Sequence, residues 1–241
     1  MARKGKMYDK QIESTFLKET MTVKIYEPEQ YNPLYENQIV IMQDGDDYFQ
    51  LGRVATISDK MHDDYELSNT VFVGIHYIDR FDRLKKYHPE GEQFEAYKSF
   101  LMKEVVPLIK DICPLNPLGT TYALMGDSLA GTIALMTAMD APEIFSKIVL
   151  QSPLVNDDVL AAASKATMIK DIEIYHSIGL EETNVETTND GHVDFLTPNR
   201  ALQEQLKQQV SNYTYKEIEG GNHTWKFWQN EMRTVFEKMF M

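Results

Sequence analysis

One serine stands in a setting that favours nucleophilic chemistry. Ser128 lies two residues after Gly126 and two residues before Ala130. Residues 122–125 form a short apolar run typical of a strand, and the small and apolar residues from Leu129 onward predict a buried helix. A serine at such a tight turn has a strained backbone that exposes its Oγ, and its neighbours must be small because strand and helix approach closely. A serine in an ordinary turn is the alternative, and the flanking elements favour the nucleophile.

A nucleophilic serine needs a base, and the base needs an acid that orients it. In a parallel sheet, ligand-facing residues follow the carboxyl ends of the strands. His223 lies in a Gly-Gly-Asn-His turn after the predicted strand 213–218, and Glu181 and Glu182 lie in the loop after the predicted strand 172–179. The chain order serine, acid, histidine suits a nucleophile elbow. We therefore expect His223 to accept the Ser128 proton.

Acyl transfer also needs two backbone N–H groups to hold the oxyanion. One is expected from Leu129, directly after the serine. The other is expected from the turn after the predicted strand 38–42, at Asp46 or its neighbour, where Gly45 permits an unusual backbone. This turn, residues 43–49, is acidic but lacks the calcium-binding spacing of an EF-hand, so we predict a solvated turn.

Strands alternate with helices along the rest of the chain after an opening hairpin. This order predicts an α/β fold with a mostly parallel sheet, helices on both faces and a single domain over residues 1–241. Polar loops are predicted at residues 80–91, on the rim of the site, and at 180–194, and Thr197 is the predicted N-cap of a helix. The predicted strands are 12–17, 21–26, 38–42, 70–75, 122–125, 145–150, 172–179 and 213–218, and the predicted helices are 54–67, 94–110, 129–136, 157–170, 198–210 and 225–240.

Composition limits the classes of partner. The 241 residues carry a net charge of −13, which argues against nucleic acid and anionic membranes as partners. Cys113 is the only cysteine, and the histidines lack metal-binding spacing, so no disulfide and no metal site are expected. No run approaches the ~20 apolar residues of a membrane span, and no apolar run follows the basic residues 1–6. We expect a cytoplasmic protein without a signal peptide, and a homodimer is the default expectation for such an enzyme.

Four groups of residues together resemble the α/β-hydrolase superfamily and, more narrowly, the Putative esterase family of enterochelin esterases, feruloyl esterases and esterase D. They occur in family order across about four fifths of the chain, which makes them more specific than the serine motif alone. Ala130 departs from the commoner glycine. The groups are residues 39–45 with Tyr48 and Phe49; residues 73–75 with Arg83 and residues 87–89; residues 126–131; and residues 220–225 with Trp228.

The resemblance implies a serine carboxylesterase mechanism without metal or cofactor. The family places its acid at the third residue after the glycine that ends the penultimate strand, and counting from Gly179 gives Glu182. Four other carboxylates of the same loop stay open as the acid: Glu181, Glu186, Asp190 and Asp194. The expected substrate is a small or medium acyl ester.

Two rival functions stay open. The first is a specialised hydrolase of a siderophore lactone, an acetylated or feruloylated sugar or a thioester, which residues 79–91 and 181–194 would decide. The second is a non-catalytic α/β-hydrolase that serves as a binding protein. Among the other histidines, His176 is expected to be structural, whereas His62 and His88 are expected to be solvated.

Overall fold

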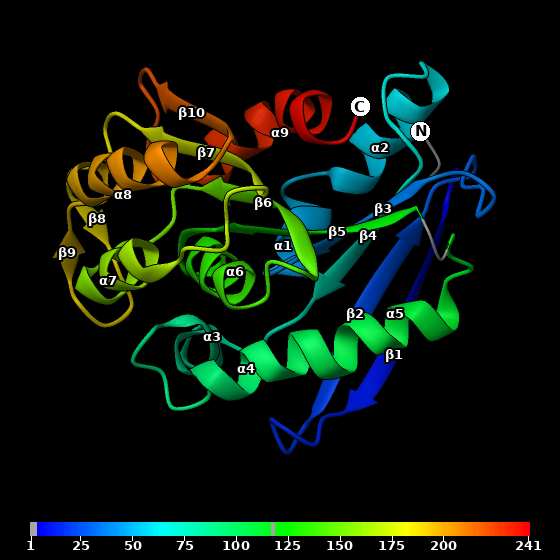
Figure 1. Cartoon of the computed structure of the whole chain (residues 1–241), viewed down its shortest axis with the longest axis horizontal. Coiled ribbons are helices and arrows are strands. Elements are labelled where there is room, and N and C mark those ends of the chain that lie inside the picture. The colour runs from blue at the N-terminus through cyan, green and yellow to red at the C-terminus, as the bar shows by residue number, and fades with distance from the viewer. Residues whose placement is uncertain (1–3, 117–118) are drawn as a thin grey trace.

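The computed structural model describes residues 4–116 and 119–241, so residues 1–3 of the basic start lie outside it. In the described residues eight strands form one sheet in the order β1-β2-β4-β3-β5-β6-β7-β10 (Figure 1). The hairpin of β1 and β2 is antiparallel and joins β4 antiparallel, whereas the later pairs are parallel. The predicted α/β fold is therefore confirmed. The strands are β1 (Lys6–Glu13), β2 (Thr20–Glu27), β3 (Asn37–Met42), β4 (Thr70–Ile75), β5 (Thr120–Asp127), β6 (Phe145–Gln151), β7 (Glu173–Gly179) and β10 (Asn212–Ile218).

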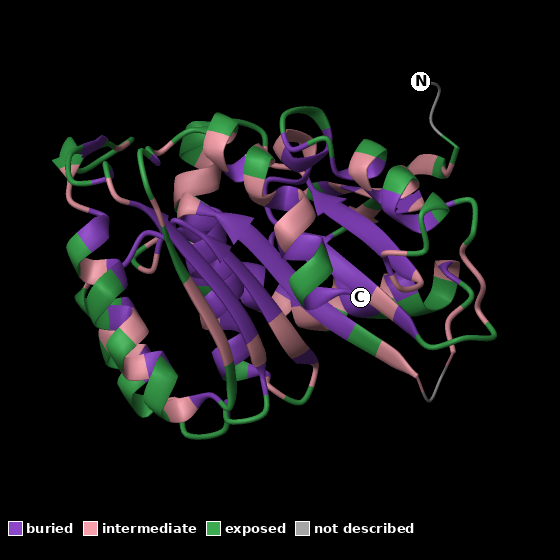
Figure 2. Ribbon diagram, turned by 90° about the horizontal axis from the view of Figure 1, so that it is seen from above, coloured by how far each residue is buried: buried purple, intermediate pink, exposed green. Residues whose placement is uncertain are grey.

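Helices cover both faces of the sheet, which explains the continuous apolar runs of the central strands. All six residues of β4 are buried. Helices α2 and α9 lie on one face and α4, α5 and α6 on the other (Figure 1), and the strands are buried between them (Figure 2). The helices are α1 (Gly45–Gln50), α2 (Val54–Asp63), α3 (Arg80–Tyr87), α4 (Phe94–Phe100), α5 (Val106–Ile112), α6 (Ser128–Asp140), α7 (Asp157–Lys165), α8 (Leu196–Gln209) and α9 (Trp225–Met239), and a π-helical turn, Leu101–Val105, joins α4 to α5.

Two segments predicted as turn or loop are helices. Helix α1 begins within residues 43–49 and ends at Gln50, and residues 80–91 contain α3. The Asp79 side chain begins α3 by accepting the N–H groups of Phe81 and Asp82, at 2.8 and 2.9 Å. Lys86 is fully buried on this helix because Asp82 and Glu19 pair with it, at 2.6 and 2.5 Å. A polar sequence thus forms a packed helix through ion pairs.

Other boundaries also differ from the predictions. The first strand is Lys6–Glu13 instead of 12–17, and it pairs along its whole length with β2. Helix α8 begins at Leu196, and Thr197 is not its N-cap; instead the Thr197 N–H donates to the Asp194 carboxylate at 3.2 Å. The predicted loop 180–194 carries a short hairpin of β8 (Val185–Glu186) and β9 (His192–Val193). Within residues 4–116 and 119–241, no helix has the length and apolar character needed to cross a membrane.

His176 lies fully buried on β7 and makes the stability of the fold depend on pH. Its Nδ1 lies 2.7 Å from the Tyr213 hydroxyl and its Nε2 lies 2.7 Å from Asn199 Oδ1. Burial lowers the pKa of His176 to about 4. In the unfolded chain the pKa is about 6.5, so between these two values the unfolded chain binds a proton that the folded chain does not.

We expect the free energy of unfolding to fall as the pH falls from about 6.5 to about 4, by up to about 3 kcal/mol from His176 alone. His176→Gln should remove this part of the pH dependence. Urea unfolding at pH 7 and pH 4.5 measures both proteins. An equal fall in wild type and His176→Gln would contradict the assignment.

Candidate active site

The predicted site residues follow neighbouring strands at one edge of the sheet. Met42 of β3 pairs with Met125 of β5, and Gln151 of β6 pairs with Ser177 of β7. Gly179, at the end of β7, pairs with Ile218 of β10. The segments that carry Ser128, Glu182 and His223 therefore leave the sheet at the same, carboxyl edge, as the alternating pattern predicts.

The turn at Ser128 has the geometry of a nucleophile elbow. Ser128 connects β5 to α6 and has a φ of 51°, a strained value for a residue with a side chain. A Cβ on Gly126 would lie 2.2 Å from the carbonyl carbon of Ala130, so the strand and helix approach too closely for any larger residue there. The contact involves the backbone of Ala130, which explains why alanine is tolerated at this position. The Ser128 carbonyl accepts the N–H of Leu154 at 3.3 Å.

Glu182 lies against His223. Its Oε2 is 2.6 Å from His223 Nδ1, and the Glu182 side chain is only 1% exposed. Its Oε1 accepts the Gly179 N–H at 2.9 Å and the Ser152 hydroxyl at 2.7 Å. A buried carboxylate with these donors is suited to orient an imidazole and to stabilise its protonated form.

The other four carboxylates of this loop lie in different settings. Glu181, Glu186 and Asp190 are exposed, and Asp194 accepts the Thr197 N–H. The turn that carries Glu182 also packs closely on the turn that carries His223. A Cβ on Gly179 would lie only 2.4 Å from the Gly221 oxygen, so there is no space for a side chain at Gly179.

Two aromatic rings pack against the His223 imidazole. The ring centroids of Phe195 and Trp228 lie 4.6 and 5.0 Å from it. Trp228 is buried, and its indole N–H donates to Ser152 Oγ at 3.1 Å. Ser152 is not among the site residues predicted from the sequence. Its one local signal is its place in Gln-Ser-Pro directly after a buried strand.

The segment after β3 differs from its prediction in two ways. Its left-handed residue is Asp44, with a φ of 58°, and not Gly45. Position 45 requires glycine for a steric reason instead, since a Cβ there would lie 2.2 Å from Gly74 Cα. Asp44 is also buried, and not solvated, because Arg83 of α3 pairs with it at 2.6 Å.

Asp46 and Leu129 occupy equivalent positions. Each is the second residue of its helix, where backbone N–H groups have no partner within the helix. Strands β3 and β5 are paired neighbours, so both helices begin beside each other at the carboxyl edge. The Asp46 side chain turns toward His76, with Oδ1 3.4 Å from Nε2.

A buried charged cluster lies beneath the elbow. Arg83 pairs with Asp44 and also donates from Nη2 to the Asp127 carbonyl at 3.3 Å. Burial raises the pKa of the Asp127 carboxyl well above its ordinary value, and the neighbouring Asp44 raises it further. Burial likewise raises the pKa of Asp44, against the opposing effect of Arg83. Arg83 thus joins the segment after β3 to the residue before Ser128.

Arg83→Met should lower the free energy of unfolding by about 3 kcal/mol, because it leaves the buried Asp44 without its ion-pair partner. Arg80→Met is the matched control, since Arg80 is exposed on the same helix and should change stability by less than about 0.5 kcal/mol. Urea unfolding measures both variants. Equal midpoints for the two would contradict a structural role of Arg83.

His62 and His88 were expected to be solvated, but both are buried. The two nitrogens of His62 lie 2.8 and 3.1 Å from the carbonyl oxygens of Ser58 and Ser68. His88 accepts the Glu90 N–H at 3.2 Å. Both are structural residues.

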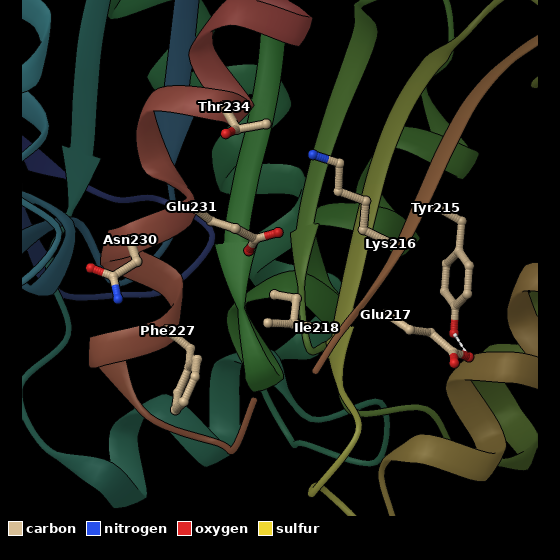
Figure 3. Close-up of a pocket in the computed structure, with 8 residues that line it drawn as sticks. All are labelled: Tyr215, Lys216, Glu217, Ile218, Phe227, Asn230, Glu231 and Thr234. Carbon is tan, nitrogen blue, oxygen red and sulfur yellow. Dashed lines mark hydrogen bonds between the residues drawn. The ribbon is translucent and has the colours of Figure 1, made fainter. Parts of the chain in front are cut away.

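A groove of about 640 Å³ lies between β10 and α9, the two elements that flank the turn of His223 (Figure 3). Figure 3 shows Glu231 and Phe227 on the α9 side, and Lys216 and Glu217 on the strand. None of the eight residues that line this groove is a predicted site residue.

The sheet order, the elbow and the Glu182–His223 pair define an α/β-hydrolase fold. More narrowly, the chain matches the Putative esterase family over residues 14–239, and it belongs to this family. The uncharacterized protein YjcH of Bacillus subtilis (strain 168) is 39% identical over 237 residues, which cover 98% of each chain.

Solved structures share the fold at low sequence identity. The enterobactin esterase FES from Shigella flexneri, in the presence of enterobactin, matches 98% of this chain with a TM-score of 0.82 and 19% identity. This chain spans only 59% of that enterobactin esterase. The BES protein from Bacillus cereus matches with a TM-score of 0.79 and 16% identity, over 99% of this chain and 95% of its own. A ferulic acid esterase matches with a TM-score of 0.69 and 12% identity, over 98% of both chains.

Proposed function

We propose that this protein is a serine carboxylesterase that hydrolyses small or medium acyl esters. The observation that carries the proposal is the buried Glu182 carboxylate 2.6 Å from His223 Nδ1, at the same sheet edge as the strained Ser128. Membership in the Putative esterase family supports the same reaction class.

In the proposed reaction Ser128 Oγ attacks the ester carbonyl while His223 Nε2 takes its proton. Glu182 holds the Nδ1–H tautomer of His223 and stabilises the imidazolium that forms. The N–H groups of Leu129 and Asp46 stabilise the oxyanion from the starts of α6 and α1. His223 then protonates the leaving alcohol, and water attacks the acyl-enzyme with His223 again as base.

No cofactor is needed for these steps, because proton transfer and oxyanion stabilisation come from side chains and backbone of the chain itself.

The second candidate is a specialised ester hydrolase. The enterobactin esterase and the ferulic acid esterase of the same fold favour a siderophore or an aromatic ester as its substrate. The segments that would select between them are α3 with its N-cap and the loop with β8 and β9, since both border the carboxyl edge.

The test is a series of p-nitrophenyl esters of increasing acyl length, with mass spectrometry of the quenched enzyme. We expect turnover of the short esters and an added acyl mass on the peptide that contains Ser128. Acylation of a different residue would contradict Ser128 as the nucleophile. No turnover of any ester would contradict the proposal and favour the non-catalytic binding protein.

A further inference from the structure

Ser152 is a second serine at the site. It is buried, and the proposed mechanism does not use it. It follows β6 directly, is 2% exposed and has a φ of 49°. A residue with a side chain holds this conformation only where its surroundings impose it. The Ser152 N–H donates to the Ser177 carbonyl at 2.8 Å, which fixes the backbone at this point.

The direction of the hydrogen bonds at Ser152 is set by Trp228. An indole N–H can only donate, so Ser152 Oγ accepts the Trp228 proton at 3.1 Å. The hydroxyl proton of Ser152 is then free to point to Glu182 Oε1, 2.7 Å away. Trp228 thus donates to Ser152, and Ser152 donates to Glu182, so the three side chains form a hydrogen-bond chain with a fixed direction.

This hydrogen-bond chain fixes the orientation of the Glu182 carboxylate plane. Its Oε1 accepts two hydrogen bonds, one from the Ser152 hydroxyl and one from the Gly179 N–H, which leaves Oε2 for His223. Hydrogen bonds to a buried carboxylate are strong, and both donors come from segments that leave neighbouring strands. Rotation of the carboxylate away from His223 would break both of them.

The position of Trp228 is fixed by Glu231, which lies about one turn further along α9. Glu231 accepts the Tyr175 hydroxyl at 2.7 Å, the Ser177 hydroxyl at 2.9 Å and the Gln151 amide at 3.0 Å. These bonds tie α9 to β6 and β7. The indole that aims Ser152 is therefore in a fixed position relative to the sheet.

We propose that Ser152 is a positioning residue of the esterase site, which acts by locking the Glu182 carboxylate against His223 under the control of the Trp228 N–H. The inference rests on the proposed function. Ser152 acts through Glu182, so its loss should slow the reaction of bound substrate without changing substrate binding.

The first test is the steady-state kinetics of Ser152→Ala on a p-nitrophenyl ester. We expect kcat to fall roughly 10-fold to 100-fold with KM changed by less than about 2-fold. Ser14→Ala is the matched control, because it also deletes a buried hydroxyl bonded to a carboxylate, but that carboxylate is Glu104 of the π-helical turn. Ser14→Ala should keep the wild-type kcat. An unchanged kcat in folded Ser152→Ala, or a change in KM alone, would overturn the proposal.

The second test asks whether Ser152 acts through Glu182. In a Glu182→Gln background, Ser152→Ala should lower kcat by less than about 3-fold, because the carboxylate that it positions is absent. Trp228→Phe should reproduce part of the Ser152→Ala loss and add little to it in the double variant. Equal losses from Ser152→Ala in both backgrounds would mean that Ser152 does not work through Glu182.

Failure of this inference can be told apart from failure of the proposed function. If ester hydrolysis persists in Ser128→Ala, the proposed function is wrong. The His223 Nδ1 proton, followed by NMR, then still tests Ser152 without reference to activity. We expect this proton to exchange faster with water in Ser152→Ala than in wild type or Ser14→Ala, and equal exchange in all three would overturn the inference.

Discussion

Ser128→Ala is expected to lower the kcat of ester hydrolysis by roughly 10⁴- to 10⁶-fold while the protein stays folded. The loss should be this large because Oγ is the atom that forms the acyl-enzyme, and water cannot take its place on the strained turn. Alanine fits the same backbone at φ 51° no worse than serine does, since both residues carry a Cβ and neither is β-branched. Hydrolysis of p-nitrophenyl acetate, with circular dichroism to show folding, measures the effect.

Ser146→Ala is a control for this variant, because Ser146 lies on β6 away from the carboxyl edge. It should keep the wild-type rate. A Ser128→Ala protein with more than about a tenth of the wild-type kcat would exclude Ser128 as the nucleophile.

His223→Gln is the second change with a very large expected effect, a fall in kcat of at least roughly 10⁴-fold. Glutamine removes the only group in the proposed reaction that both accepts the Ser128 proton and returns it to the leaving alcohol. Because Ser128 and His223 act as one unit, the double variant Ser128→Ala with His223→Gln should be no slower than Ser128→Ala alone. The same p-nitrophenyl ester assay measures all three proteins.

Glu182→Gln should cost less than His223→Gln, because it removes an orienting charge and leaves the base in place. A loss from Glu182→Gln that exceeds the loss from His223→Gln would contradict the roles assigned here. Glu181→Gln is the matched control, since Glu181 is adjacent but exposed, and it should leave kcat unchanged.

The parts of the site that the sequence predicts are those encoded by short local patterns. The spacing of Gly126, Ser128 and Ala130 reflects a contact within one strand–turn–helix unit. The juxtaposition of Glu182 and His223 follows because their turns succeed neighbouring parallel strands. Glu182 itself was selected by resemblance, and its burial against His223 is what separates it from the other carboxylates of the loop.

The features that the sequence did not predict depend on contacts between distant positions. Ser152 bonds Glu182 across 30 residues and Trp228 across 76 residues, so no local pattern contains these bonds. Asp44 looked like a solvated residue of an acidic turn because its partner, Arg83, lies 39 residues away. Helix α3 was missed for the same reason, since its buried Lys86 is paired by Glu19 of the opening hairpin.

The most direct test of the central claim is labelling by a fluorophosphonate probe, which reacts with an activated serine and requires no knowledge of the substrate. Wild type, Ser128→Ala and His223→Ala would be compared side by side, each shown to be folded. We predict that wild type is labelled, that Ser128→Ala is not, and that labelling of His223→Ala is greatly slowed. Absence of labelling in folded wild type, or labelling that persists in Ser128→Ala, would contradict an activated nucleophile at Ser128.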